Sequence, residues 1–354
     1  MAKVAVLKTT PETVVSDYGR LMSMAEYQKA VPKVNETVLK INLSWSLYYP
    51  ACSTEPWQLE GVVKTLRDDG YEKVIPVENK TVVTDPKKGA RLNKWLPVLE
   101  KYGLDFTALP DVEWVEYKPK TELLALDKIF PEGQLIPKMF SGKNVIHLPT
   151  VKTHGHTTMT GAMKNAFGGL ITEKRHHCHK MIHEVLVDLL AIQKEIHPGI
   201  FAVMDGTVCG SGAGPRTMEP VEKDYILASE DQVAIDAISA KMMGFDPLKI
   251  PFLKIAHDRG LGIADVGQID VVGEDVKDVN FHFSTGKSAV IAGDQLFRKG
   301  GLSFIEPILF HTPLFKLCIL GSETYHDRLW YPVVGKRKIS SFNKTKWGRL
   351  FESY

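Results

Sequence analysis

Short runs of β-branched and apolar residues alternate with amphipathic segments along most of the chain. This alternation is typical of βα units that wind a mostly parallel sheet with helices on both faces, so we predict an α/β fold. In the first half we expect strands at residues 4–8, 37–45 and 73–78 and helices at residues 57–69 and 90–102.

The alternation continues after a proline-bearing connector at residues 111–138. Strands are expected at residues 144–148, 200–204, 225–228, 269–272 and 289–291, and helices at residues 181–197, 232–243 and 251–259. The sequence thus predicts two α/β lobes, residues 1–138 and 139–300, and an extension over residues 301–354.

The extension changes character along its length. Residues 302–320 are about as long as a membrane span, but they include Glu306, Pro307 and Lys316, so no transmembrane helix is predicted. A buried strand or helix pair is favoured there over a surface-lying membrane anchor. Residues 328–354 mix basic and aromatic side chains, for which packing against the body is favoured over weak contact with a membrane surface.

Composition narrows the function classes. The 354 residues include 44 basic and 42 acidic side chains, a formal charge of +2, so no broad basic footprint for nucleic acid exists. The four cysteines form no C-x-x-C pair, so we predict no iron–sulfur cluster of the chain's own. A reducing, cytoplasmic setting is expected, and residues 1–8 are interpreted as a strand, not a signal peptide.

The densest polar segment, residues 149–169, follows the strand predicted at residues 144–148. Loops at the carboxyl ends of parallel strands collect ligands, and Lys152 and Lys164 add positive charge among threonine hydroxyls. The segment therefore suits a phosphate or carboxylate group. The alternative is a threonine-rich helix cap with solvated lysines.

A histidine cluster follows at residues 176–183. If a helix begins near His177, His179 and His183 fall four residues apart on one face and could hold a divalent metal. A third ligand could come from His154, His156 or an acidic residue such as Asp205. The alternative is neutral imidazoles that act as donors or acids toward an anionic ligand.

Residues 205–216 join a strand-end carboxylate to a run of glycines. Gly212 and Gly214 would let the loop bring backbone N–H groups against a ligand, while Asp205 would serve as a general base, a metal ligand or an acceptor for loop amides. Cys209 is expected to be a bystander.

The last candidate carboxylate is Asp236, in the helix predicted at residues 232–243. Ser229 and Gln232 form a capping box at the start of that helix. Asp236 follows three apolar residues, so we expect it to point inward and to pair with Lys152 or Lys164.

The order of these motifs resembles the domain-of-unknown-function family 362. The matching stretch includes P-x-x-K-T-H at residues 149–154, K-N-x-F-G at 164–168, D-G at 205–206, G-x-G-P at 212–215 and A-S-x-D-x-V-A-x-D at 228–236. Looser agreement extends the resemblance to about residues 35–275. By match to these motifs, the resemblance implies the following pocket residues: Lys40, Asn42, Lys152, His154, Lys164, Asn165, Asp205, Gly212, Pro215 and Asp236.

Three hypotheses of function follow. The first is an enzyme that binds a small anionic molecule in a cleft between the lobes, with Lys, His and Asp side chains moving protons, around a divalent metal or without one. The second rests on the resemblance, because many family members carry a ferredoxin-like segment that this chain lacks: a redox partner or assembly factor that borrows a cluster from another chain. The third is a membrane-surface contact through residues 301–354.

Overall fold

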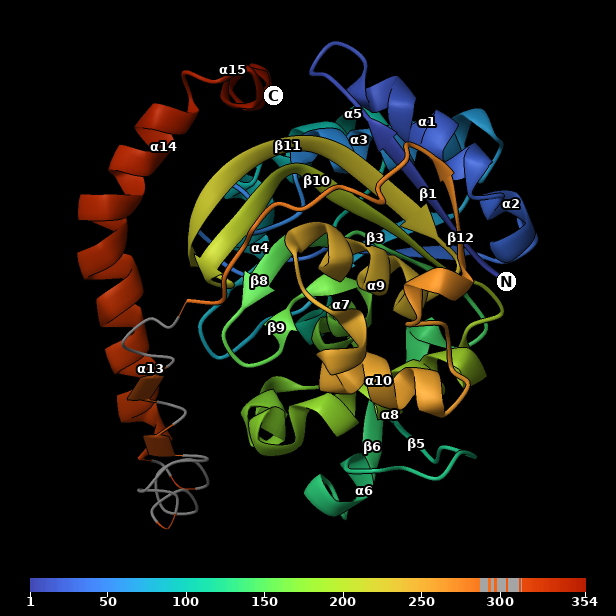
Figure 1. The fold of residues 1–354 in the computed structure, drawn as a ribbon. Helices are drawn as coiled ribbons and strands as arrows, with labels where there is room; N and C mark the ends of the chain where they lie inside the picture. The colour runs from blue at the N-terminus through green and yellow to red at the C-terminus, as the bar shows by residue number, and fades with distance from the viewer. Residues whose placement is uncertain (287–291, 294–295, 298–303, 305–311, 313) are drawn as a thin grey trace.

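The fold is an α/β sandwich around one large sheet (Figure 1). The structure, a computed structural model, describes residues 1–286, 292–293, 296–297, 304, 312 and 314–354. Ten strands join in this sheet: β1 (Ala2–Lys8), β2 (Thr37–Lys40), β3 (Val74–Glu78), β4 (Thr107–Ala108), β7 (Asn144–His147), β8 (Thr150–His154), β9 (Thr158–Met159), β10 (Ile200–Ala213), β11 (Thr217–Ser229) and β12 (Ile269–Gly273). The predicted strand at residues 289–291 lies outside the described residues.

The main path of the sheet runs β12-β1-β11-β10-β7-β2-β3-β4, with β8 and β9 beside β10. Most neighbouring strands are parallel, and antiparallel pairing joins β11 to β1 and β10, and β9 to β8. The predicted α/β class is confirmed. Strands from both predicted lobes share this sheet, and the connector contributes a separate pair, β5 (Trp114–Tyr117) and β6 (Gln134–Pro137).

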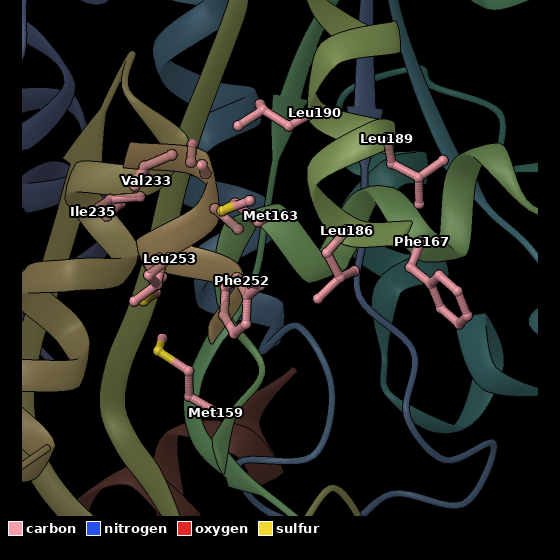
Figure 2. Packing of buried hydrophobic residues seen from close by; sticks show 14 of the residues in the cluster. Met159, Met163, Phe167, Leu186, Leu189, Leu190, Val233, Ile235, Phe252 and Leu253 are labelled. Atoms are coloured by element: carbon pink, nitrogen blue, oxygen red, sulfur yellow. The ribbon is translucent and has the colours of Figure 1, made fainter. Parts of the chain in front are cut away.

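Helices cover both faces of the sheet, which explains why its strands are apolar at successive positions. On one face lie α7 (Gly161–Leu170), α8 (Ile182–Ile196), α9 (Gln232–Met243) and α10 (Pro251–Asp258), whose buried side chains interlock in Figure 2. On the other lie α1 (Val14–Met24), α3 (Pro56–Asp68), α5 (Trp95–Lys101) and α15 (Lys346–Ser353). In β10, for example, Ala202 and Met204 belong to the first core and Phe201 and Val203 to the second.

The glycine-rich segment after Asp205 differs from its prediction. It continues β10 as far as Ala213, and only the short connection to β11 turns. Its glycines serve close packing: a Cβ on Gly210 would lie 2.5 Å from the Met218 sulfur. A glycine-rich run therefore signals here a strand crowded by its neighbours as much as a ligand loop.

The N-cap of α9 is Asp231, not Ser229 as the capping-box pattern predicts. The Asp231 carboxylate accepts hydrogen bonds from the backbone N–H groups of Val233 and Ala234, while Ser229 donates to the carbonyl of Lys3 across the sheet. Asp231 also accepts from the N–H of Ile263, so it ties a loop to the helix.

We expect Asp231→Ala to lower the free energy of unfolding by about 1 to 2 kcal/mol, because it removes a helix cap. Urea unfolding followed by circular dichroism measures this loss. Asp246→Ala removes the cap of a three-residue turn only and serves as the control, with an expected loss below about 0.5 kcal/mol. Equal losses in the two variants would contradict the special role of Asp231.

The C-terminal helices lie along one side of the body as a long rod (Figure 1). The rod comprises α13 (Phe315–Glu323), the π-helical segment η7 (Thr324–Gly335) and α14 (Lys336–Phe342) and ends at α15. Trp347 and Phe351 are buried against the body, and the Phe351 ring stacks on Tyr48. At this end of the chain, the contacts agree with the interpretation that residues 328–354 pack against the body.

The apolar stretch at residues 302–320 is different. Its described end, α13, has no buried side chain, so the expected closure of the core does not occur there. Residues 302–303, 305–311 and 313 lie outside the described part of the chain. Among the described residues, none of the helices reaches the length and apolarity that a membrane crossing requires.

Candidate functional site

A cavity of about 610 Å³ lies between the carboxyl ends of the central strands and the inner side of α13 and η7. This volume is within the usual range for small-molecule sites. Lys40 and Asn42 come from the end of β2, Glu78 from the end of β3, His154 from the end of β8, and Lys164 and Asn165 from α7. Because parallel strands end at one edge of the sheet, residues far apart in sequence meet there.

Lys152 lies just behind the cavity wall and holds the side chain of Asn42 in place. Its ammonium group donates hydrogen bonds to Asn42 Oδ1 (2.6 Å), the carbonyl of Cys52 (2.6 Å) and Thr150 Oγ1 (2.8 Å). Asn42 Nδ2 in turn approaches Asn165 Oδ1 at 3.5 Å. Lys152 is therefore a buried support for Asn42 and does not line the cavity itself.

Lys40 and Glu78 form a buried ion pair at the cavity edge, with 2.7 Å between Lys40 Nζ and Glu78 Oε1. The Lys40 stem passes beneath α7 at two glycines, where a Cβ on Gly168 would lie 3.1 Å from its ammonium nitrogen. Glu78 is the one carboxylate among the described residues that line the cavity. Since Glu78 already pairs with Lys40, the cations of the described lining outnumber its carboxylates.

Three cationic side chains line the cavity without a carboxylate partner among the described residues: Lys164, Arg175 and Arg216. Arg175 donates to the carbonyl of Lys80, and Arg216 donates to Ser322 Oγ. Lys164 has no hydrogen-bond partner in the described part of the chain, although it is largely removed from water. The cavity is thus electropositive and offers a free ammonium group to a ligand.

Burial and, to a smaller extent, the nearby charges of Lys152 and Arg175 together lower the pKa of Lys164 to about 7. Burial likewise lowers the pKa of Lys152 to about 8. A bound anion would reverse this effect at Lys164, because an opposite charge favours the protonated amine.

The first turn of α7 is placed by Asp236. Its carboxylate accepts hydrogen bonds from the N–H groups of Ala162 (2.5 Å) and Met163 (3.0 Å), which satisfies the helix N-terminus. Gly161 precedes them with a φ of +75°, and a Cβ there would lie 2.4 Å from the Asp236 carboxylate. Asp236 therefore positions the helix that carries Lys164. It accepts from backbone N–H groups and does not form the predicted pair with Lys152 or Lys164.

Asp205 is also away from the cavity. It is fully buried and accepts hydrogen bonds from the Tyr18 hydroxyl (2.6 Å), the Trp57 indole (3.0 Å) and the Thr207 hydroxyl and N–H. With all these donors, it holds the sheet to α1 and α3. Of its predicted roles, the structural one agrees with these contacts. Gly212 does not line the cavity, whereas Gly214 does.

Histidines form one part of the wall. His154, His156, His176 and His179 line the cavity, and the rings of His156 and His179 stack with centroids 5.3 Å apart. Burial keeps the pKa of His154 well below its usual range, so its imidazole is neutral. Neutral imidazoles can donate or accept a proton at a bound ligand.

The predicted metal pair, His179 and His183, does not lie on one continuous α-helix. Residues 173–181 form a 3₁₀ segment and α8 begins only at Ile182, so His179 and His183 do not share a helix face. His183 stacks instead on Phe252 in the core. Within the described residues, no three His, Cys, Asp or Glu side chains are arranged to hold a metal ion.

The opposite wall comes from a part of the chain without a recognisable motif. Phe315, Ile319 and Tyr325 of α13 and η7 face the cavity, and the Phe315 ring stacks on His176 with centroids 4.0 Å apart. Glu78, Arg175 and Arg216 also line the cavity, although none of them was predicted from the sequence as a site residue. The position of Glu78 at the end of a strand could have identified it, whereas nothing in the sequence marks the helical wall.

The fold and site define an α/β protein with a cavity that is basic on one side and apolar on the other. The family model for the domain of unknown function DUF362 matches residues 37–241, and the chain belongs to this family. One curated relative is the thylakoid-associated protein sll1697 of Synechocystis sp. (strain ATCC 27184 / PCC 6803 / Kazusa), 26% identical over 218 residues. The match spans 59% of this chain and 63% of the relative. No solved structure is significantly similar.

Proposed function

We propose that this protein binds a small amphiphilic molecule bearing a phosphate or carboxylate group, and that it acts as an enzyme on that molecule. The observation that carries the proposal is that Lys164 lines the cavity and its ammonium group has no hydrogen-bond partner among the described residues. Arg175 and Arg216 line the same space, so a ligand anion would find charge and hydrogen-bond donors together.

The apolar wall supports the amphiphilic part of the proposal. Phe315 and Ile319 line the cavity together with Phe167 and Val83, so the cavity offers apolar surface to a hydrocarbon or ring portion of the ligand. A fully polar ligand such as free phosphate would leave these apolar side chains in contact with water. The ligand's anionic group therefore belongs beside α7 and its apolar portion beside α13.

Two groups in the cavity have the chemistry for proton transfer. Lys164 exchanges its proton near neutral pH, because its pKa lies at about 7, and His154 is a neutral imidazole. The two predicted aspartates are occupied elsewhere. We thus propose lysine and histidine, without Asp205 or Asp236, as the acid–base groups.

Isothermal titration calorimetry with three probes tests the binding proposal. Hexanesulfonate carries a permanent anion and an apolar tail, methanesulfonate carries only the anion, and hexan-1-ol has only the tail. We expect hexanesulfonate to bind at least tenfold more tightly than either control, because it alone satisfies both walls. Equal affinity for hexan-1-ol would refute an anion site.

The cysteines bear on the location of the protein. The four cysteines form no disulfide among the described residues, which favours a reducing compartment such as the cytoplasm. The redox or assembly partner predicted from the sequence remains the alternative function. Iron and sulfide analysis after anaerobic purification tests it, and stoichiometric iron with sulfide would favour it over the enzyme.

A further inference from the structure

The outer side of the C-terminal rod carries large apolar side chains that no part of the described chain covers. Leu317, Leu329 and Val333 are 63%, 59% and 63% exposed, and Leu314 and Leu320 about half exposed. We call these five side chains the apolar stripe. Isolated exposed leucines are ordinary, but five within 20 residues of one rod mark an interaction surface.

Basic residues flank the apolar stripe. Lys316, Arg328, Lys336 and Arg337 are all exposed on the same stretch of chain. The two acidic residues there are half-buried, and Asp327 accepts a hydrogen bond from the Trp45 indole, which turns it toward the body. The outward side is therefore apolar and cationic at once.

We propose that the apolar stripe and its basic flank dock this protein onto an anionic lipid surface, with the rod lying in the plane of the membrane. Apolar side chains set among lysine and arginine are typical of helices that lie at the boundary of headgroups and acyl chains. The negative headgroups complement the four cations. This inference does not depend on which ligand fills the cavity.

Charge favours lipid over a second copy of the chain as the occupant. Two copies that met through this surface about a twofold axis would bring the same cations close together. A lipid surface would instead attract them. Docking would also bring the cavity close to the bilayer, because the inner side of the same helices forms its wall.

Vesicle flotation tests the proposal with the full chain. Vesicles of phosphatidylcholine containing about 30% phosphatidylglycerol should carry the wild-type protein, and vesicles of pure phosphatidylcholine should carry much less. The double variant Leu317→Gln with Leu329→Gln should partition at least tenfold more weakly. Leu96→Gln with Leu248→Gln, two leucines exposed elsewhere, is the matched control and should change partitioning less than twofold.

A second pair of variants tests the charges. Arg328→Gln with Lys336→Gln should weaken partitioning by about 25-fold, because each basic residue near an anionic surface contributes about fivefold. Lys249→Gln removes an exposed lysine elsewhere and should have little effect. Circular dichroism confirms that each variant is folded.

The proposal is overturned by any of three results. These are absence of wild-type flotation with anionic vesicles, equal flotation of the stripe variant, and a lipid-free dimer that the stripe variant abolishes. The last result would identify a second copy of the chain as the occupant.

Discussion

Lys164→Met should weaken hexanesulfonate binding at pH 6 at least thirtyfold, or about 2 kcal/mol, while the protein remains folded. The reason is that methionine keeps the length of the side chain but removes the ammonium group, which has no other partner in the described part of the chain. Calorimetric titration of the wild type and the variant measures the change. Lys254→Met, at an exposed surface pair, is the control and should leave the affinity unchanged.

The same residue predicts a pH dependence. Since the pKa of Lys164 in the free protein is lowered to about 7, the amine is charged below that pH and neutral above it. Hexanesulfonate affinity should therefore fall about tenfold per pH unit as the pH rises above 7, until the residual affinity of the neutral amine is reached. Lys164→Arg, which keeps its charge, should bind at pH 6 and lose this dependence.

Either of two outcomes would contradict the assignment of Lys164. One is wild-type affinity in Lys164→Met, which would place the anion elsewhere. The other is an unchanged pH profile in Lys164→Arg, which would make a different group responsible for the titration.

Gly161→Ala should lower the free energy of unfolding by roughly 3 to 5 kcal/mol. Part of this cost is the positive φ of +75°, which disfavours any side chain, and part is the overlap of the new methyl group with the Asp236 carboxylate at 2.4 Å. The displaced carboxylate would also release the N–H groups of Ala162 and Met163. Urea unfolding at pH 7 measures the loss.

Gly70→Ala separates the two contributions. Gly70 has a φ of +77°, but a Cβ there would meet nothing within 4 Å. It should therefore cost only about 1 to 2 kcal/mol, the backbone part. If the two variants lose equal stability, the contact between Gly161 and Asp236 is not what positions α7.

Much of the basic side of the cavity could be predicted from the sequence. Lys40, Asn42, His154, Lys164 and Asn165 were all predicted as site residues, and all line the cavity. Lys40, Asn42 and His154 stand at a strand end or just after it, and parallel strands bring their carboxyl ends to one edge. Lys164 and Asn165 lie in α7, and it was the family resemblance that implied Lys40, Asn42 and Asn165. Lys152 was predicted to contact the ligand, but it lies behind the cavity wall, where it donates to Asn42 and to the carbonyl of Cys52.

The carboxylates could not be assigned in this way. Asp205 and Asp236 lie in strongly patterned motifs, but their donors are supplied by residues distant in sequence: Tyr18 and Trp57 for one, the start of α7 for the other. A carboxylate that stabilises packing and one that faces a ligand have the same local sequence pattern. Only the position of the surrounding donors distinguishes them.

The sequence by itself determined the alternation of strands and helices, the mostly parallel sheet and the edge at which polar residues gather. These follow from the local periodicity of apolar residues and from the βα alternation, which brings strand ends to one edge. The tertiary structure alone decided that α13 and η7 close the cavity with an apolar wall, and that their outer side stays uncovered. Those helices follow α7 by about 150 residues and carry no motif. Their position depends on long-range packing, such as Trp330 and Tyr331 against Trp45, which no local pattern encodes.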